Sequence, residues 1–394
     1  FYRNVYTAYG KENLFNTQDP EFHRNRRKLL GGPLAESSVR LCQGRICPVV
    51  ELALQKMKEE MRAEGAADVF KWWTLMTTDI ICELTFGHSH RLLDLGQKND
   101  YIHLMEQMGY LSVIRCTFPL LTSIARAMPL PFFGTAVQAT HSLTGYANEL
   151  LGHSKRLAAS EPDRVKQTLF TGLYKANEDG KLTFEEIGNE AEIYLIGGSD
   201  TTAITLTYLV WLVCRRPLVR AALTTELQLL PKDFGDVDLK NLRYLNQVIT
   251  ETLRLYPAGP DGLPRVVPAG GAEICGYYVT EGTTVSVQAY SMQRMAEVYP
   301  MPDEFDPSRW DEPTKAMRDA LTVWGRGGRN CIGMHLAQLE LRFAVAKFFL
   351  AFPDAEMSAI DGMNDNDMME TCHFLLSPKG RRCLIASSGA MSEN

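Results

Sequence analysis

The chain has 394 residues, of which 45% are hydrophobic and 22% charged, and its net charge is −6. This composition is that of a folded globular protein rather than a disordered one, and the mild negative charge argues against nucleic acid as a bulk partner. Nine cysteines occur without a C-x-x-C spacing, so neither a disulfide framework nor a zinc site is indicated.

The first two thirds of the chain carry apolar residues at the spacing of amphipathic helices. This pattern predicts helices near residues 45–62, 72–87, 136–158, 184–215, 217–229 and 241–255. Residues 117–135 mix apolar side chains with prolines, which indicates a region rich in loops. No internal repeat interrupts this order, so a repeat architecture is not indicated.

Residues 193–214 form a strongly apolar stretch that is about long enough to span a bilayer. The stretch contains Asp200, four threonines and a glycine pair. An ionisable residue at membrane depth is costly, so a buried core helix is the better interpretation. The chain begins at Phe1 without a signal peptide, and we expect no transmembrane segment within it.

The pattern of the sequence changes after residue 260. Residues 270–290 show an alternating pattern of side chains rich in β-branched residues, with two glycines where turns are expected. This pattern predicts two short strands. Residues 296–323 are rich in proline and charge and are expected to be irregular coil, whereas residues 334–351 predict a last long helix. The chain as a whole therefore predicts a mainly α (α+β) fold, with a helix-rich body and a small β region.

The sequence "WGRGGRNCIG" (residues 324–333) surrounds one thiol with glycines and two arginines. Glycines allow tight turns that bring amide groups close to a sulfur, and Cys331 precedes a helix N-terminus, which favours a thiolate. A thiolate serves as a nucleophile, a redox group or a metal ligand. A nucleophile would need a histidine base, and His335 is near in sequence without a third orienting group. A glycine-rich turn with an incidental buried cysteine is the remaining alternative.

Three further motifs precede this loop. "GGSDTT" (197–202) places two glycines inside an apolar helix, where each costs roughly 1 kcal/mol against alanine and indicates a need for space beside the backbone. "ETLR" places Glu251 and Arg254 on one helical face, and "PDEFDPSRW" supplies Arg309. Taken alone, these motifs are also compatible with a helix kink and with solvated surface ion pairs.

The order of the four motifs resembles that of the cytochrome P-450 monooxygenases, most closely their fungal microsomal branch. The resemblance covers nearly the whole chain, from "FNTQDPEFHRNRRKLL" to "SPKGRRCL". It implies that residues 1–394 form a single haem-thiolate monooxygenase domain with the cytochrome P-450 fold. The N-terminal anchor and the first sheet strands and helices of the family are expected to be missing, either because the sequence is a fragment or because its gene model is truncated. In an intact protein of this length, the strands near residues 273–287 would lack partners.

The resemblance also implies a cofactor, haem b, with Cys331 as the axial thiolate ligand of the iron. A thiolate ligand pushes electron density onto the iron and favours O–O cleavage. The haem propionates would be bound by His23, Arg27, Arg265 and Arg329. Gly325 in the cysteine loop and Gly198 in the long helix complete the expected cofactor-binding set.

Asp200 and Thr201 look like the family's acid–alcohol pair, which would guide protons to iron-bound oxygen and makes them the expected catalytic residues. Glu251, Arg254 and Arg309 would form a buried ion network that supports the haem-binding core. Substrate contacts are expected from residues 104–133, 194–198 and 258–263. Gln293 stands where relatives often carry histidine, and the sequence suggests no function for it.

The implied reaction inserts one oxygen atom from O2 into a small apolar substrate in fungal secondary metabolism. The electrons would come from NADPH, which is not bound directly, through NADPH–cytochrome P-450 reductase, with cytochrome b5 as a further candidate donor. The expected docking patch for the reductase consists of Arg326, Arg329, Arg342 and Lys347. Through the missing anchor, the protein would lie on the cytosolic face of the endoplasmic reticulum membrane.

Other functions remain open at this stage. A haem-thiolate isomerase, dehydratase or peroxygenase would need no reductase, although the Asp200–Thr201 pair argues against it. A non-catalytic haem-binding sensor, an inactive haem-binding fragment and a haem-free scaffold are further alternatives. The sequence does not indicate the substrate, the position oxidised or the oligomeric state.

Overall fold

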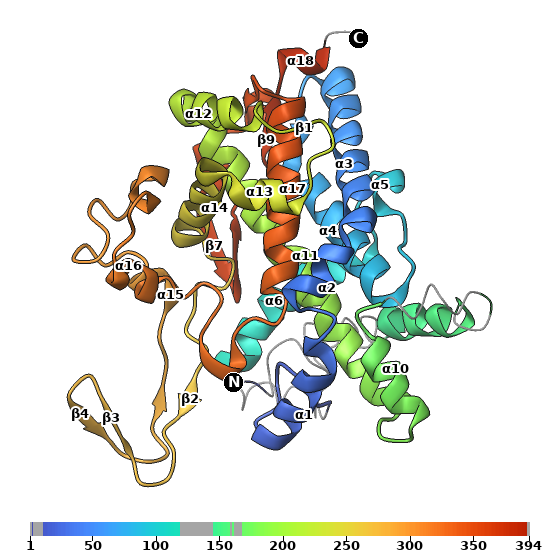
Figure 1. Cartoon of the computed structure of the whole chain (residues 1–394), viewed down its shortest axis with the longest axis vertical. Coiled ribbons are helices and arrows are strands. Elements are labelled where there is room, and N and C mark those ends of the chain that lie inside the picture. The colour runs from blue at the N-terminus through green and yellow to red at the C-terminus, as the bar shows by residue number, and fades with distance from the viewer. Residues whose placement is uncertain (1, 3–10, 119–144, 158–159, 161–167, 392–394) are drawn as a thin grey trace.

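Helix α11 (Phe184–Cys214) runs through the middle of the molecule in the computed structural model, which describes residues 2, 11–118, 145–157, 160 and 168–391 (Figure 1). Its start is fixed by a capping box, in which the Thr183 hydroxyl accepts from the Glu186 amide and the Glu186 carboxylate accepts from the Thr183 amide. Beyond this turn most of its side chains are buried in protein.

The core forms where two helices pack against α11 and a third helix packs against both of them. The first two are α4 (Val69–Phe86) and α17 (Met334–Ala351), and the third is α3 (Gln43–Glu64). Helix α4 is buried on nearly every face, and the Thr77 hydroxyl on it donates to the Ser199 carbonyl of α11 at 2.8 Å. Trp73 and Phe348 meet between α4 and α17, with ring centroids 5.8 Å apart. This core carries the two helices that matter most for the site, α11 and α17.

The other described helices surround this core. They are α1 (Pro20–Gly31), α2 (Glu36–Leu41), α5 (Leu92–Leu95), α6 (Asp100–Thr117), α10 (Thr171–Glu178), α12 (Pro217–Leu227), α13 (Asp236–Asn241), α14 (Arg243–Leu255), α15 (Ala289–Met292), α16 (Lys315–Ala320) and α18 (Ser388–Met391). Residues 145–157 are also helical. Short 3₁₀ turns occur at η1 (Pro307–Trp310), η2 (Gly327–Arg329), η3 (Ile360–Gly362) and η4 (Asp365–Met368).

The described strands are short and all their pairings are antiparallel. Strand β9 (Leu384–Ala386) lies between β1 (Ala67–Asp68) and β6 (Glu356–Met357). The two-stranded pairs are β2 (Arg265–Val266) with β5 (Thr284–Val285), β3 (Ala272–Ile274) with β4 (Tyr277–Val279), and β7 (Glu370–His373) with β8 (Leu375–Pro378). Figure 1 shows β2 to β5 projecting from the helical body.

The structure confirms the helix-rich fold and the predicted helices within the described residues, while residues 119–135, 136–144 and 158 lie outside them. Three predictions are corrected. Residues 270–290 contain three strands rather than two, and these strands do have partners, because β3 pairs with β4 and β5 pairs with β2. Residues 296–323 contain η1 and α16 and are not coil throughout. Helix α6 was not predicted although it has 18 residues. Helix α10 and strands β6 to β9 were not predicted either, because short elements carry little periodic signal.

None of the described helices is by itself long and apolar enough to cross a bilayer. Helices α11 and α12, which are bent by 110° where they meet, pass that test of length and composition only as a pair.

A buried ionic contact fixes α1 against the first half of α11. The Arg26 guanidinium lies 2.9 Å from the Glu186 carboxylate and 3.2 Å from that of Glu190. The Glu190 carboxylate also accepts two short contacts from the Leu14 amide, at 3.0 and 3.1 Å. Because α1 carries His23 and Arg27, this contact sets where those two side chains stand relative to α11.

We predict that Glu190 makes stability fall as the pH rises from about 4.5 to about 7. Burial raises the pKa of Glu190 to about 7, although Arg26 and the Leu14 amide lower it. The folded state therefore holds this proton more tightly than the unfolded chain. The stabilisation is fully present below the pKa that Glu190 has in the unfolded chain, and it is lost as the pH rises through the pKa that Glu190 has in the folded protein. Glu190→Gln should flatten the pH dependence of the thermal midpoint across this window.

Glu186→Gln is the matched control for this measurement. Burial acts to raise the pKa of Glu186, but hydrogen bonds from Thr183 and Arg26 leave this pKa lowered. Glu186 is therefore ionised throughout the pH range in which Glu190 titrates. This variant should keep most of the slope of the unchanged protein. Equal slopes for the unchanged protein and Glu190→Gln would contradict the assignment.

Candidate functional site

The cysteine loop turns back on itself just before α17. The Cys331 amide donates to the Trp324 carbonyl at 2.7 Å, which closes the loop, and the Gly325 amide donates to the Thr322 carbonyl at 2.8 Å. Gly325 and Gly327 have φ angles of +66° and +71°, which side chains strongly disfavour. The two glycines are therefore required by the turn itself.

Cys331 lies just before α17, whose first backbone amides have no partner within the helix. Cys331 is exposed to solvent on one side, and many protein atoms surround its sulfur on the other side. Burial raises the pKa of this thiol, against the lowering effect of the Gly333 amide, the Arg27 charge and the Met334 amide. A bound metal cation deprotonates a coordinating thiol outright, and iron would supply that charge.

Four cationic side chains from distant segments meet beside this loop. Burial lowers the pKa of His23, and the charges of Arg329, Arg27 and Arg265 lower it further. Burial and the charge of Arg265 also lower the pKa of Arg329. Within the described part of the chain, none of the four forms an ion pair with a carboxylate. Like charges held together favour an anionic ligand, and the two propionates of haem b fit that requirement.

The three arginines of this cluster also donate to backbone carbonyls. Arg27 donates to the Asn330 carbonyl at 2.8 Å and to its side-chain oxygen at 2.5 Å, so it clamps the residue next to Cys331. Arg329 donates to the Thr17 carbonyl at 2.9 Å. Arg265 donates to the Pro264 carbonyl and to the Tyr2 hydroxyl. The sequence did not single out Asn330, because a partner 303 residues away leaves no local signal.

The two glycines of α11, Gly197 and Gly198, have different surroundings. A Cβ on Gly197 would meet no atom within 4 Å, whereas a Cβ on Gly198 would lie 2.5 Å from Ile81 of α4. Ile81 fills the space beside Gly198, so the packing of α4 against α11 requires this glycine, and its expected contact with the cofactor stays a prediction. Gly197 provides the open side, and the Thr201 hydroxyl donates to its carbonyl at 2.9 Å. Asp200 is half-buried next to that threonine.

The predicted buried ion network is confirmed. Arg254 binds both oxygens of Glu251 at 2.8 Å, and the Arg309 guanidinium reaches the same carboxylate at 2.8 Å. Glu251 and Arg254 are completely buried. Trp310 also donates to Glu251, at 2.9 Å, which the sequence argument missed although the tryptophan follows Arg309 directly.

The predicted docking patch is wrong for Arg342. Arg342 is buried and bonds the Asp236 carboxylate at 2.6 and 2.9 Å. Lys347 is paired with Glu51 at 2.7 Å. Both stand on α17, whose helical spacing is the same for core and surface positions, so the sequence could not separate buried cations from exposed ones.

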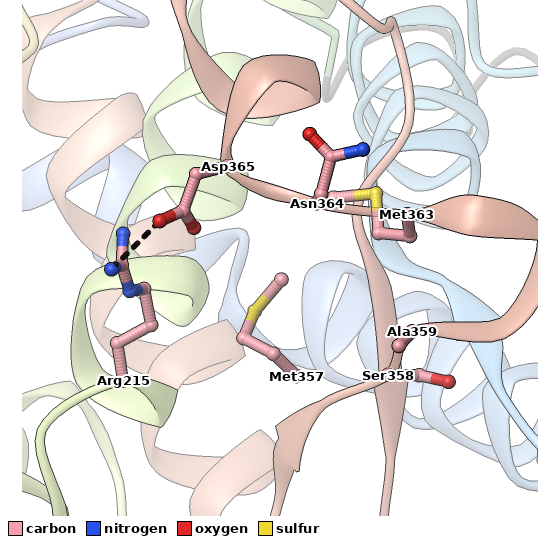
Figure 2. Close-up of a pocket in the computed structure, with 7 residues that line it drawn as sticks. All are labelled: Arg215, Met357, Ser358, Ala359, Met363, Asn364 and Asp365. Atoms are coloured by element: carbon pink, nitrogen blue, oxygen red, sulfur yellow. Dashed lines mark ion pairs between the residues drawn. The ribbon is translucent and has the colours of Figure 1, made fainter.

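A surface pocket of about 450 Å³ lies elsewhere, beyond the C-terminal end of α11 (Figure 2). An ion pair of 3.0 Å between Arg215 and Asp365 crosses it, and Met357 points into it. Arg215 follows Thr201 by roughly 20 Å of helix. The pocket shares no residue with the cysteine loop, the cationic cluster or the glycine pair, so it is not the site described above.

A family model described as Cytochrome P-450 matches residues 2–385. The chain belongs to the cytochrome P-450 family. It is 44% identical over 374 residues to "Cytochrome P-450 monooxygenase tazI" of Aspergillus terreus, covering 94% of this chain and 76% of that protein. It is 36% identical over 403 residues to "Cytochrome P-450 monooxygenase azaI" of Aspergillus niger, covering 96% and 85%.

The crystal structure of a cytochrome P-450, CYP102L1, superposes with a TM-score of 0.78 at 20% identity. The match covers 95% of this chain and 84% of that one. At this identity the likeness concerns the fold, and it confirms the predicted P-450 fold. The family is that of haem-containing monooxygenases, so the protein is an oxidoreductase that incorporates oxygen from O2.

We predict opposite effects for alanine at the two glycines of α11. Gly198→Ala should lower stability by about 1–3 kcal/mol, because its methyl group would overlap Ile81. Gly197→Ala should leave stability unchanged or raise it by up to about 1 kcal/mol, because its methyl meets open space and alanine favours helix. Thermal midpoints measure both, and the loss caused by Gly198→Ala should be smaller when Ile81 is already alanine, because the overlapping side chain is then absent. Equal losses at the two glycines would refute this division.

Proposed function

We propose that the protein is a fungal haem-thiolate monooxygenase of secondary metabolism that binds haem b through Cys331 and oxidises a small apolar organic compound. The position of Cys331 just before the start of α17, beside a cationic cluster without carboxylate partners in the described chain, carries the proposal. His23, Arg27, Arg265 and Arg329 would hold the propionates, and Gly325 would let the loop approach the porphyrin. When bound, the haem supplies activation of dioxygen.

Asp200 and Thr201 act as the proton-delivery pair in this proposal. The Thr201 hydroxyl donates to the Gly197 carbonyl, and it can instead donate to an acceptor that enters the open space beside that glycine. In this proposal Asp200, which is half-buried and precedes Thr201 in α11, returns a proton to the threonine from solvent. Both side chains therefore move protons without forming a covalent intermediate.

The substrate class, electron donor and location complete the proposal. Buried apolar side chains, among them Ile196 of α11, line the same stretch of helix as Gly197 and support a small apolar substrate. Electrons come from NADPH through NADPH–cytochrome P-450 reductase, with cytochrome b5 as a second donor, on the cytosolic face of the endoplasmic reticulum membrane. The fungal monooxygenases reported above support this assignment by similarity.

The test is the carbon monoxide difference spectrum of the reduced protein. We expect the long-wavelength band of a haem-thiolate complex, and we expect Cys331→Ser to lose that band while haem stays bound through the cationic cluster. Cys275→Ser is the matched control, since Cys275 is also exposed but lies in the β3–β4 turn. A thiolate-type band that persists in Cys331→Ser, or that is absent from the unchanged protein, would overturn the proposal.

A second prediction concerns proton delivery. Thr201→Ala should keep haem but raise the hydrogen peroxide released per NADPH oxidised, roughly ten-fold or more, because a positioned acid–base group contributes at least that much. The assay uses the reductase and an apolar compound that shifts the haem spectrum of the unchanged protein. Thr205→Ala removes a similar back-bonded hydroxyl one turn along α11 and should change little. Turnover with peroxide alone and none with NADPH would favour a peroxygenase instead.

A further inference from the structure

Gln293 is completely buried at the end of α15, and its side chain joins two segments of the chain. Its amide nitrogen donates to the carbonyls of Leu253 and Arg254, at 3.2 and 2.8 Å. Its amide oxygen accepts from the Thr322 amide at 3.0 Å. One side chain thus connects the end of α14 to the segment that enters the cysteine loop.

The Thr322 end of this contact leads directly to the sulfur ligand. The Thr322 carbonyl accepts from the Gly325 amide, and the next residue but one, Trp324, accepts from the Cys331 amide at 2.7 Å. Fixing Thr322 therefore fixes the first turn of the loop. The position of Cys331 relative to the donors on Gly333 and Met334 depends on that turn.

The other end of the contact lies at the last turn of α14, beside the buried Glu251–Arg254 ion pair. Leu253 and Arg254 belong to the last turn of α14, whose carbonyls have no partner within the helix. Arg254 is held by Glu251 and in turn donates to the main-chain carbonyl of Gln293 at 2.8 Å. A glutamine amide offers two donors and an acceptor, and all of them are used here.

We propose that Gln293 is a positioning residue for the thiolate ligand: it holds the entry of the cysteine loop on the Glu251–Arg254 frame and so keeps the Cys331 sulfur in register. The inference rests on the proposed role of Cys331 as the haem ligand. Gln293 touches neither the haem nor the substrate, and it acts only through Thr322. Its loss should therefore weaken sulfur ligation more than it weakens the fold.

The experiment compares two buried glutamines. Gln293→Met keeps the side-chain length and removes all three hydrogen bonds. Gln247→Met is the matched control, because Gln247 is a buried residue of α14 that donates to Asp311 at 2.8 Å and does not contact the loop. The rate at which the thiolate-type carbon monoxide complex converts to the thiol type is measured below the unfolding temperature. We expect conversion roughly ten-fold faster for Gln293→Met and nearly unchanged for Gln247→Met, as fits loss of the one hydrogen bond, from the Thr322 amide, that reaches the loop.

Rescue by the conservative variant separates positioning from general packing. A neutral histidine has one acceptor and one donor, so Gln293→His can accept from the Thr322 amide and donate to the Arg254 carbonyl. We expect it to restore most of the slow conversion. If Gln293→Met does not fold, Gln293→Asn, which is too short to reach both ends, replaces it in the same comparison.

The outcomes distinguish this inference from the proposed function. If the unchanged protein shows no thiolate band, the role of Cys331 fails and the inference falls with it. If the band is present and depends on Cys331 but Gln293→Met or Gln293→Asn converts no faster than Gln247→Met, only the positioning role is overturned. Faster conversion with rescue by histidine supports it.

Discussion

The structure of the site depends on one buried carboxylate, that of Glu251. It receives hydrogen bonds from Arg254, Arg309 and Trp310, which come from α14 and from η1 more than fifty residues later. Such a group is stable inside a protein only when its partners are complete, so each partner is constrained by the others. The long irregular segment before the cysteine loop, which has little secondary structure of its own, is thereby held at a defined distance from α14.

The proposed haem site differs from this network, because its charged groups lack partners of opposite charge among the residues that the structure describes. Here the fold brings His23, Arg27, Arg265 and Arg329 together without carboxylate partners in the described chain, and burial together with the charges of the three arginines lowers the pKa of His23. Cys331 is similar, since burial raises its pKa and a metal cation would reverse that preference. The fold thus maintains charges whose natural complement is a dianionic, iron-containing cofactor. Part of the stability of this region is expected to come from binding it.

Sequence reasoning succeeded where a local pattern was sufficient. The long helices, the turn at Gly325, the triad of Glu251, Arg254 and Arg309, and the four cations of the cluster all follow from spacing or from the resemblance to a family. It failed where burial or partners decide. Arg342 was expected on the surface and is instead buried against Asp236, and the roles of Gly197 and Gly198 are distinguished only by Ile81 on another helix.

The sequence by itself determined the family, the motif residues and the helical character, because these depend on residues that are close in the chain. The tertiary structure alone decided which charges lie together, which glycine faces open space and what Gln293 does. These properties depend on contacts between segments far apart in sequence, such as Arg27 with Asn330 and Gln293 with Thr322. A one-dimensional pattern carries no information on such contacts, because the energy that selects them arises only once the core has packed.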